Sequence, residues 1–199
     1  MPRLRSLKTP DSSLYRSLHD RAVRLLARRD HSRAELTRKL SRPQASGRKR
    51  RNRRASELES GAGVAEIDAE TLAEVIEAVL DALVEAGYLN DARYAASLAE
   101  QRRDKGYGPL AIRAKLGERG IDSELQRDAL DELGQEDWVG NATEALQRRF
   151  SDAELASGEQ RERARQARFL RARGFDSATA RRAADVAQRT ARAAIEDAP

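Results

Sequence analysis

Apolar side chains recur every three or four residues along most of the chain, the spacing that places them on one face of an α-helix. The clearest stripe lies within residues 69–86 and contains Leu72, Val75, Ile76, Val79, Leu80, Leu83 and Val84. No convincing run alternates apolar and polar residues, the pattern typical of a half-buried β-strand. The periodicity therefore predicts an all-α protein of about nine helices joined by short connections.

Residues that favour helix ends separate the predicted helices. Glycine suits the left-handed position that closes a helix, and aspartate accepts hydrogen bonds from the first N–H groups of the next one. The turn residues predicted on this basis are Gly87, Asp91, Gly106, Gly120, Asp122, Gly174 and Asp176. Ser32 and Glu35 also have the spacing of a capping box, which predicts a short helix with Leu36 and Leu40 on one face.

Two internal similarities indicate repeated units. Residues 119–129 (RGIDSELQRDA) align without a gap on residues 173–183 (RGFDSATARRA), and residues 32–40 (SRAELTRKL) resemble residues 108–116 (GPLAIRAKL). A unit of this size buries little apolar surface by itself, so neighbouring units should stack. The sequence predicts three tandem three-helix repeats that form an elongated, curved body. The alternative is a nine-helix globule whose glycine turns recur by chance.

The predicted repeats divide the chain into five parts. These are a flexible N-terminal arm (1–13), a first repeat (14–90), a second repeat (91–135), a third repeat (136–193) and a C-terminal tail (194–199). The first repeat carries an insertion at about residues 41–66, which has no apolar periodicity and is expected to be a disordered basic loop.

Charge is distributed unevenly along the sequence. Residues 1–54 contain 18 Lys and Arg but only 4 Asp and Glu, whereas residues 55–90 contain 9 acidic residues and no basic one. The two charges balance over the remaining residues, and the whole chain has a formal net charge of +5. A basic block of this kind indicates a phosphate-rich or acidic partner, although basic faces can also be merely solvated.

Composition argues against several kinds of chemistry. The chain has no Cys, which excludes disulfides, cysteine zinc ligands and a cysteine nucleophile. Its two histidines, His19 and His31, have no metal-ligand companion at helical spacing, and no Ser or Thr has a paired base. No apolar run approaches the roughly 20 residues that cross a bilayer. We expect a cytoplasmic protein that is not an enzyme, uses no cofactor or metal, and binds no membrane.

Several segments, in order along the chain, resemble the RecX family of recombinase regulators. They are residues 22–40 (AVRLLARRDHSRAELTRKL), 80–95 (LDALVEAGYLNDARYA), 105–109 (KGYGP), 115–121 (KLGERGI) and 164–175 (ARQARFLRARGF). The resemblance implies a modular, non-enzymatic protein that binds the RecA–DNA filament and inhibits its extension, ATP hydrolysis and strand exchange. A negative regulator of homologous recombination and of the SOS response is thereby expected. The basic insertion is longer than the family pattern suggests.

Basic residues supply the candidate contacts to the filament or to single- and double-stranded DNA, because guanidinium groups bind phosphate and carboxylate well. The candidates are Arg24, Arg28, Arg29, Arg48, Lys49, Arg50, Arg51, Arg53, Arg54, Arg113, Lys115, Arg161, Arg165, Arg168, Arg171, Arg181 and Arg182. We expect a monomer. Two other functions stay open: a direct DNA-binding protein of helix-turn-helix character, built on helices near 23–29 and 32–40, and a protein scaffold without DNA contact.

Overall fold

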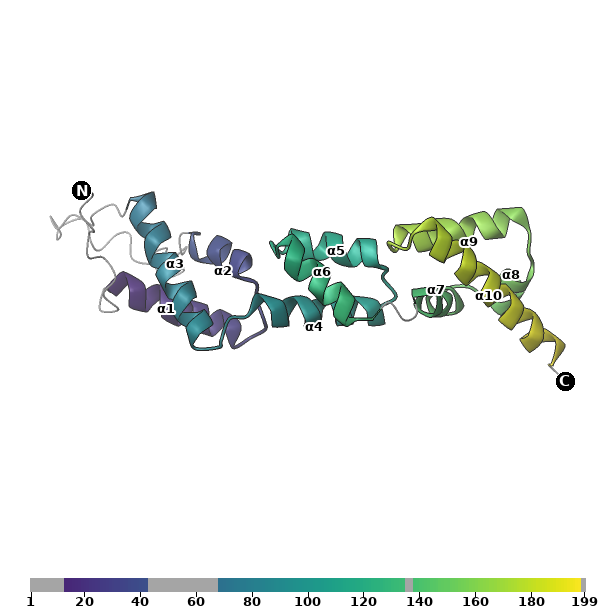
Figure 1. Cartoon of the computed structure of the whole chain (residues 1–199), viewed down its shortest axis with the longest axis horizontal. Helices are drawn as coiled ribbons and strands as arrows, with labels where there is room; N and C mark the ends of the chain where they lie inside the picture. Colours follow the sequence, from purple (N-terminus) through teal and green to yellow (C-terminus); the bar gives the residue numbers. More distant parts are fainter. Residues whose placement is uncertain (1–12, 43–67, 135–137, 198–199) are drawn as a thin grey trace, which may run out of the picture. The chain divides into compact units, whose positions relative to one another are not determined.

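The computed structural model describes residues 13–42, 68–134 and 138–197, and these residues form ten α-helices and no strand (Figure 1). The predicted all-α class is therefore confirmed. The helices fall into two compact units, one ending at Asn90 and the other beginning at Asp91.

The first unit contains α1 (Ser13–Leu26), α2 (Arg33–Leu40) and α3 (Ala69–Glu85). One apolar core joins the three helices. Its fully enclosed side chains include Leu36, Ile76, Leu80 and Leu83. The predicted α3 stripe supplies nearly half of this core, although Val84 at its edge is exposed.

The second unit contains two groups of helices, each around its own core. The first group comprises α4 (Asp91–Asp104), α5 (Pro109–Glu118) and α6 (Ser123–Glu132). The second comprises α7 (Trp138–Gln147), α8 (Asp152–Ala156), α9 (Gln160–Ala172) and α10 (Ser177–Glu196). Trp138 packs against both cores. Because Trp138 is the only tryptophan of the chain, its fluorescence reports on the junction of these two groups.

Side-chain caps explain where several helices begin. Asp122 Oδ1 accepts hydrogen bonds from the backbone N–H groups of Glu124 and Leu125, both at 2.9 Å. Asp176 makes the equivalent pair of bonds at the start of α10. Ser32 caps α2 by accepting from the N–H of Glu35. These contacts satisfy N–H groups that have no partner within their own helix.

The short helix α8 is absent from the sequence-based prediction. Five residues are too few to show a helical period, but a capping box does mark its start. Ser151 Oγ accepts from the N–H of Glu154, and the Glu154 carboxylate accepts from the N–H of Ser151. The α7–α10 group consequently has four helices rather than the three expected.

The α9–α10 turn supplies the cap of α5, so the two groups of the second unit meet through main-chain atoms (Figure 1). The N–H of Gly108 donates to the carbonyl of Arg173 at 2.8 Å, and the N–H of Leu110 donates to the carbonyl of Gly174 at 3.1 Å. Gly108 offers no side chain of its own to cap α5. The carbonyl-rich end of α9 thus compensates the N–H-rich end of α5, an arrangement that their dipoles favour.

Arginine side chains strengthen the same junction. Arg148 and Arg173, from the α7–α10 group, donate to the carbonyls of Asp104 and Lys105 at the end of α4, at 3.1 and 2.8 Å. Tyr107 lies between the guanidinium groups of Arg102 and Arg173, which are 4.8 and 4.9 Å from the ring centroid. Such cation–π contacts hold the turn between α4 and α5 against the neighbouring group.

The end of α2 is held by an arginine side chain of α1. Arg21 donates to the carbonyls of Lys39 at 2.7 Å, Leu40 at 3.4 Å and Arg42 at 3.2 Å. The terminal carbonyls of a helix lack partners within the helix, and a cation placed there is stabilising. The Arg21 side chain therefore closes α2, whereas α5 and α9 are each closed by a glycine turn.

Replacing Arg21 with methionine, which keeps most of the apolar stem, should lower the free energy of unfolding by about 1 kcal/mol, because three carbonyls lose a charged donor. The measurement is urea unfolding followed by far-UV circular dichroism. Arg24→Met on the exposed side of α1 is the matched control and should change stability by less than about 0.5 kcal/mol. Equal stability of the two variants would show that Arg21 does not cap α2.

Candidate functional site

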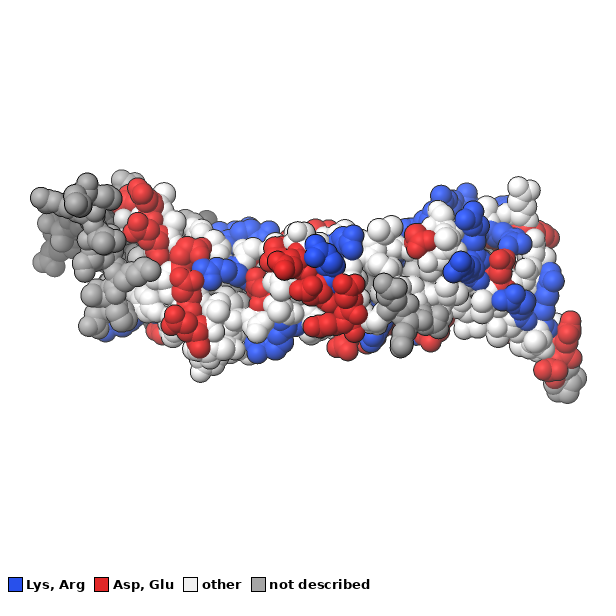
Figure 2. All heavy atoms as spheres, viewed as in Figure 1, with Lys and Arg blue, Asp and Glu red and all other residues white. Residues whose placement is uncertain are grey.

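Exposed basic residues of the second unit gather on α9 and α10. Figure 2 shows Lys and Arg side chains gathered over these two helices. Among the residues that the structure describes, six arginines of α9 and α10 are exposed and form neither an ion pair nor a side-chain hydrogen bond: Arg161, Arg168, Arg171, Arg181, Arg182 and Arg189. We call these six residues the α9–α10 arginine set. They can meet the oxygens of a partner without first giving up a carboxylate of this chain.

Arg165, predicted to belong to this surface, is instead engaged within the fold. Its Nη1 lies 2.8 Å from Glu154 Oε1 and 3.3 Å from Glu162 Oε2, and its guanidinium covers the ring of Phe150. The hydrogen bond to Glu154 is the main reason why the pKa of Arg165 is raised. Arg165 therefore serves first to attach α9 to α8.

The two predicted basic residues of α5, Arg113 and Lys115, also differ in whether they pair with a carboxylate of the chain. Arg113 is exposed and forms no ion pair with any residue in the described part of the chain. Lys115 is half-buried, and its Nζ lies 2.6 Å from Glu118 Oε2. Only Arg113 of this pair is free to meet a partner.

In the first unit, Arg24 and Arg28 are exposed, whereas Arg29 belongs to a cluster around Glu35. Arg29 forms an ion pair with both carboxylate oxygens of Glu35. The Nδ1 atom of His31 lies 3.2 Å from Oε2, and Nζ of Lys39 lies 3.4 Å from Oε1. The Glu35 side chain is buried, so the cluster fixes the turn between α1 and α2.

The cluster shifts the pKa values of its members. Burial opposes ionisation of Glu35, but the hydrogen bonds and charges of Arg29 and His31 outweigh it and lower the pKa of Glu35 from 4.5 to about 2. Burial is the main reason why the pKa of His31 is lowered from 6.5, and the charge of Arg29 acts in the same direction. Glu35 is therefore ionised, and His31 neutral, at physiological pH.

The predicted basic insertion, from residue 43 onward, lies outside the described residues. Its candidates Arg48, Lys49, Arg50, Arg51, Arg53 and Arg54 therefore have no structural description.

Acidic side chains cover other helices. Figure 2 shows them over α3 and over α6. On α3, Arg33 of α2 bridges Glu77 and Asp81, the latter at 2.8 Å. Acidic surfaces of this kind repel phosphate, so within the second unit an anionic partner should prefer α9 and α10 to α6.

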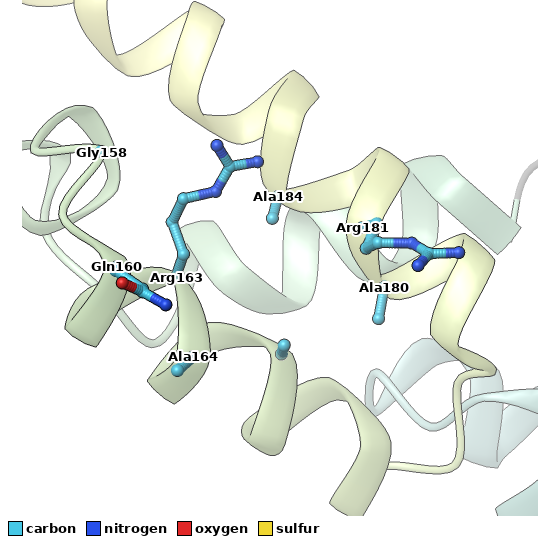
Figure 3. A pocket seen from close by; sticks show the side chains of 8 residues that line it. Gly158, Gln160, Arg163, Ala164, Ala180, Arg181 and Ala184 are labelled. Atoms are coloured by element: carbon cyan, nitrogen blue, oxygen red, sulfur yellow. The ribbon is translucent and has the colours of Figure 1, made fainter.

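A groove between α9 and α10 was not predicted from the sequence (Figure 3). It has a volume of about 490 Å³ and is lined by Gly158, Gln160, Arg163, Ala164, Ala167, Ala180, Arg181 and Ala184. Arg163 extends from α9 towards α10, where it pairs with Asp185. A groove requires two helices at a particular separation, so the sequence of either helix alone gives no sign of it.

Metal-binding clusters and membrane-spanning helices are both absent from the described ranges. No cluster of three or more His, Asp or Glu residues there could hold a metal ion. No helix there is long and apolar enough to cross a membrane.

Comparisons with known proteins agree on one family. The sequence profile of the family described as "RecX, second three-helix domain" matches residues 90–130. The chain is 38% identical over 163 residues to the regulatory protein RecX of Stenotrophomonas maltophilia strain R551-3, covering 82% of each chain. It is 41% identical over 154 residues to the regulatory protein RecX of Pseudomonas syringae pv. tomato strain DC3000, covering 77% of this chain and 81% of the relative.

Solved structures show the same fold. The crystal structure of RecX from Lactobacillus salivarius superposes with a TM-score of 0.63 at 18% identity, over 87% of this chain and 96% of that one. A second crystal structure, of a regulatory protein RecX, superposes with a TM-score of 0.60 at 21% identity, over 83% of this chain and 69% of that one.

Proposed function

Since the chain belongs to the RecX family of regulatory proteins and is not an enzyme, we propose that it binds the RecA–DNA filament and inhibits filament extension, ATP hydrolysis and strand exchange. In this role it is a negative regulator of homologous recombination and of the SOS response, acting as a monomer in the cytoplasm. The observation that carries the proposal is the α9–α10 arginine set, displayed by a member of this family.

The chemistry of these arginines supports the proposal. A RecA–DNA filament presents DNA phosphates and protein carboxylates, and a guanidinium group binds either kind of oxygen through its planar set of donors. An arginine that already pairs with a carboxylate of its own chain must exchange one partner for another, whereas a free one does not. The six free cations therefore make α9 and α10 the preferred contact surface of the second unit.

The first unit gives less support to the helix-turn-helix alternative. Such a protein would place α2 in the major groove of DNA and contact bases from its side chains. Arg33 of α2 is already paired with Glu77 and Asp81, and Lys39 lies 3.4 Å from Glu35. Of the three cations that α2 carries, two are thus already paired with carboxylates of the chain and would have to leave them to contact DNA.

The decisive experiment measures the single-strand-dependent ATPase of purified RecA with increasing amounts of this protein, alongside its binding to naked DNA. Inhibition should occur well below the concentration that coats naked DNA. Absence of inhibition, or inhibition that follows naked-DNA binding, would overturn the proposal. A strong preference for one duplex sequence would instead favour the helix-turn-helix function.

The basic insertion is expected to increase affinity for DNA. Replacing its six clustered cations, Arg48, Lys49, Arg50, Arg51, Arg53 and Arg54, with glutamine should weaken binding to single-stranded DNA at moderate salt. If all six contact phosphates, the logarithmic salt dependence should become less steep by about 4, since each contact contributes roughly 0.7. Deletion of residues 44–62 should have the same effect and leave the melting temperature nearly unchanged. Unaltered DNA affinity in both variants would remove the insertion from the binding surface.

A further inference from the structure

The groove between α9 and α10 combines an apolar floor with a cationic rim. Ala164 and Ala167 of α9 face Ala180 and Ala184 of α10, and Ala180 and Ala184 are buried. Arg163 and Arg181 stand at the edges (Figure 3). Its volume of about 490 Å³ falls within the roughly 300–1,000 Å³ of ordinary binding clefts.

The rim offers two cations of different kinds. Arg163 is tied to Asp185, so part of its charge is already balanced. Arg181 is exposed and forms no ion pair with a residue of the described ranges. An incoming carboxylate would therefore find one free guanidinium beside the alanine floor and a second with unused donors across from it.

A nucleic-acid backbone fits the groove poorly. Phosphates and sugars seated on alanine methyl groups would lose water without gaining hydrogen bonds there, which is unfavourable. An aliphatic side chain loses water favourably on the same floor. The combination of floor and rim thus matches a polypeptide segment that places an aliphatic side chain between acidic ones.

We propose that the α9–α10 groove binds an acidic peptide segment carrying an aliphatic side chain, presented by the protein component of the recombinase filament. This inference rests on the proposed function and separates two kinds of contact within it. The groove holds protein, and the arginines outside it, such as Arg182 on the same helix, are available to phosphate. Charge complementarity and the apolar floor together identify the occupant.

The test compares two pairs of matched variants. Arg181→Glu reverses a charge at the rim, and Arg127→Glu reverses one at an exposed position of α6, outside both the groove and the α9–α10 arginine set. Ala164→Trp fills the groove from an exposed position on α9, and Ala172→Trp adds the same side chain at an exposed position outside it. Each protein, labelled at its N-terminus, is titrated with preformed RecA filaments on single-stranded DNA and, separately, with naked single-stranded DNA. Melting curves confirm that all four variants fold.

Arg181→Glu and Ala164→Trp should each weaken filament binding about tenfold or more, the change expected when one central contact of an interface is lost. The control variants Arg127→Glu and Ala172→Trp should each weaken filament binding less than about threefold. Ala164→Trp should bind naked DNA as tightly as Ala172→Trp does.

Three results would count against the inference, and they are distinguishable. If Arg181→Glu and Ala164→Trp bind filaments like their controls while the wild-type protein binds normally, the groove is not used, and the proposed function stands. If Ala164→Trp loses filament and naked-DNA binding in parallel, the groove holds nucleic acid. If the wild-type protein does not bind filaments, the proposed function and this inference fail together.

Discussion

Replacing Gly174 with alanine is expected to lower the free energy of unfolding by about 4 kcal/mol, a large effect for a single added methyl group. Gly174 has a φ of +89°, a conformation that costs other residues about 1–2 kcal/mol. A Cβ atom there would also lie 2.3 Å from the backbone nitrogen of Ala111 and 2.4 Å from its Cβ. The turn after α9 and helix α5 could accommodate the methyl group only by moving apart.

Substitutions at two other glycines separate the free-energy cost of the backbone conformation from the cost of the close contact. Gly87 has a φ of +73°, but a Cβ added there would meet no atom within 4 Å, so Gly87→Ala should cost only about 1 kcal/mol. Gly108 has an ordinary φ of −87°, yet a Cβ there would lie 2.5 Å from the carbonyl oxygen of Gly174. Gly108→Ala should therefore cost about 2–3 kcal/mol through contact alone.

Urea unfolding followed by circular dichroism would rank the three variants, and Trp138 fluorescence would show whether the junction of the second unit opens first. The expected order of destabilisation is Gly174, then Gly108, then Gly87. Similar values for Gly174→Ala and Gly87→Ala would mean that the close approach of the α9–α10 turn to α5 does not contribute to stability.

The second large effect concerns Glu35, which is only 6% exposed. Glu35→Gln keeps the shape of the side chain but removes the charge that Arg29, His31 and Lys39 surround. We expect a loss of about 2 kcal/mol at pH 7, less than for a fully buried pair because Arg29 is itself half-exposed. Glu74→Gln on the exposed face of α3 is the control and should change stability by less than about 0.5 kcal/mol.

The same residue makes stability depend on pH in a defined direction. The pKa of Glu35 is about 2 in the folded protein and 4.5 ordinarily, so on acidification the unfolded chain takes up the proton first. The contribution of Glu35 is complete above pH 4.5 and is lost as the pH falls towards about 2. The lowered pKa of His31 acts in the same direction below pH 6.5.

Unfolding measured between pH 7 and pH 2 would test this linkage. The wild-type protein should lose stability on acidification, and Glu35→Gln should show a flatter profile between pH 4.5 and pH 2. Parallel profiles for the wild-type protein and this variant would show that the Glu35 carboxylate is not held ionised by its neighbours.

The sequence predicted the helices well because their signals are local. The apolar stripe of α3 and the caps at Asp122 and Asp176 depend on residues within a few positions of one another. The repeated RGxD turn also placed Gly174 at the end of a helix. The contact of Gly174 with Ala111 joins residues 63 positions apart in the sequence, and no local pattern indicates it.

The candidate site was less predictable, because availability of a cation depends on its neighbours in space. Arg165 and Arg168 look alike on a helical wheel, but only Arg165 meets Glu154, eleven positions away. The pairing of Lys115 with Glu118 could have been anticipated from their spacing of three residues. The alanine floor of the groove, by contrast, exists only once α9 and α10 are packed together.

The way in which α2 ends has a consequence for how the chain could vary in length. The helix is closed by the Arg21 side chain, which reaches its carbonyls from α1, so its end does not depend on a glycine turn. The turn after α9 does depend on one, and its backbone lies against α5. Sequence can therefore be added after α2 without disturbing a helix end, and this position is the natural place to graft a tag or a reporter domain. Residues inserted at Gly174 would separate α5 from the carbonyl groups that cap it.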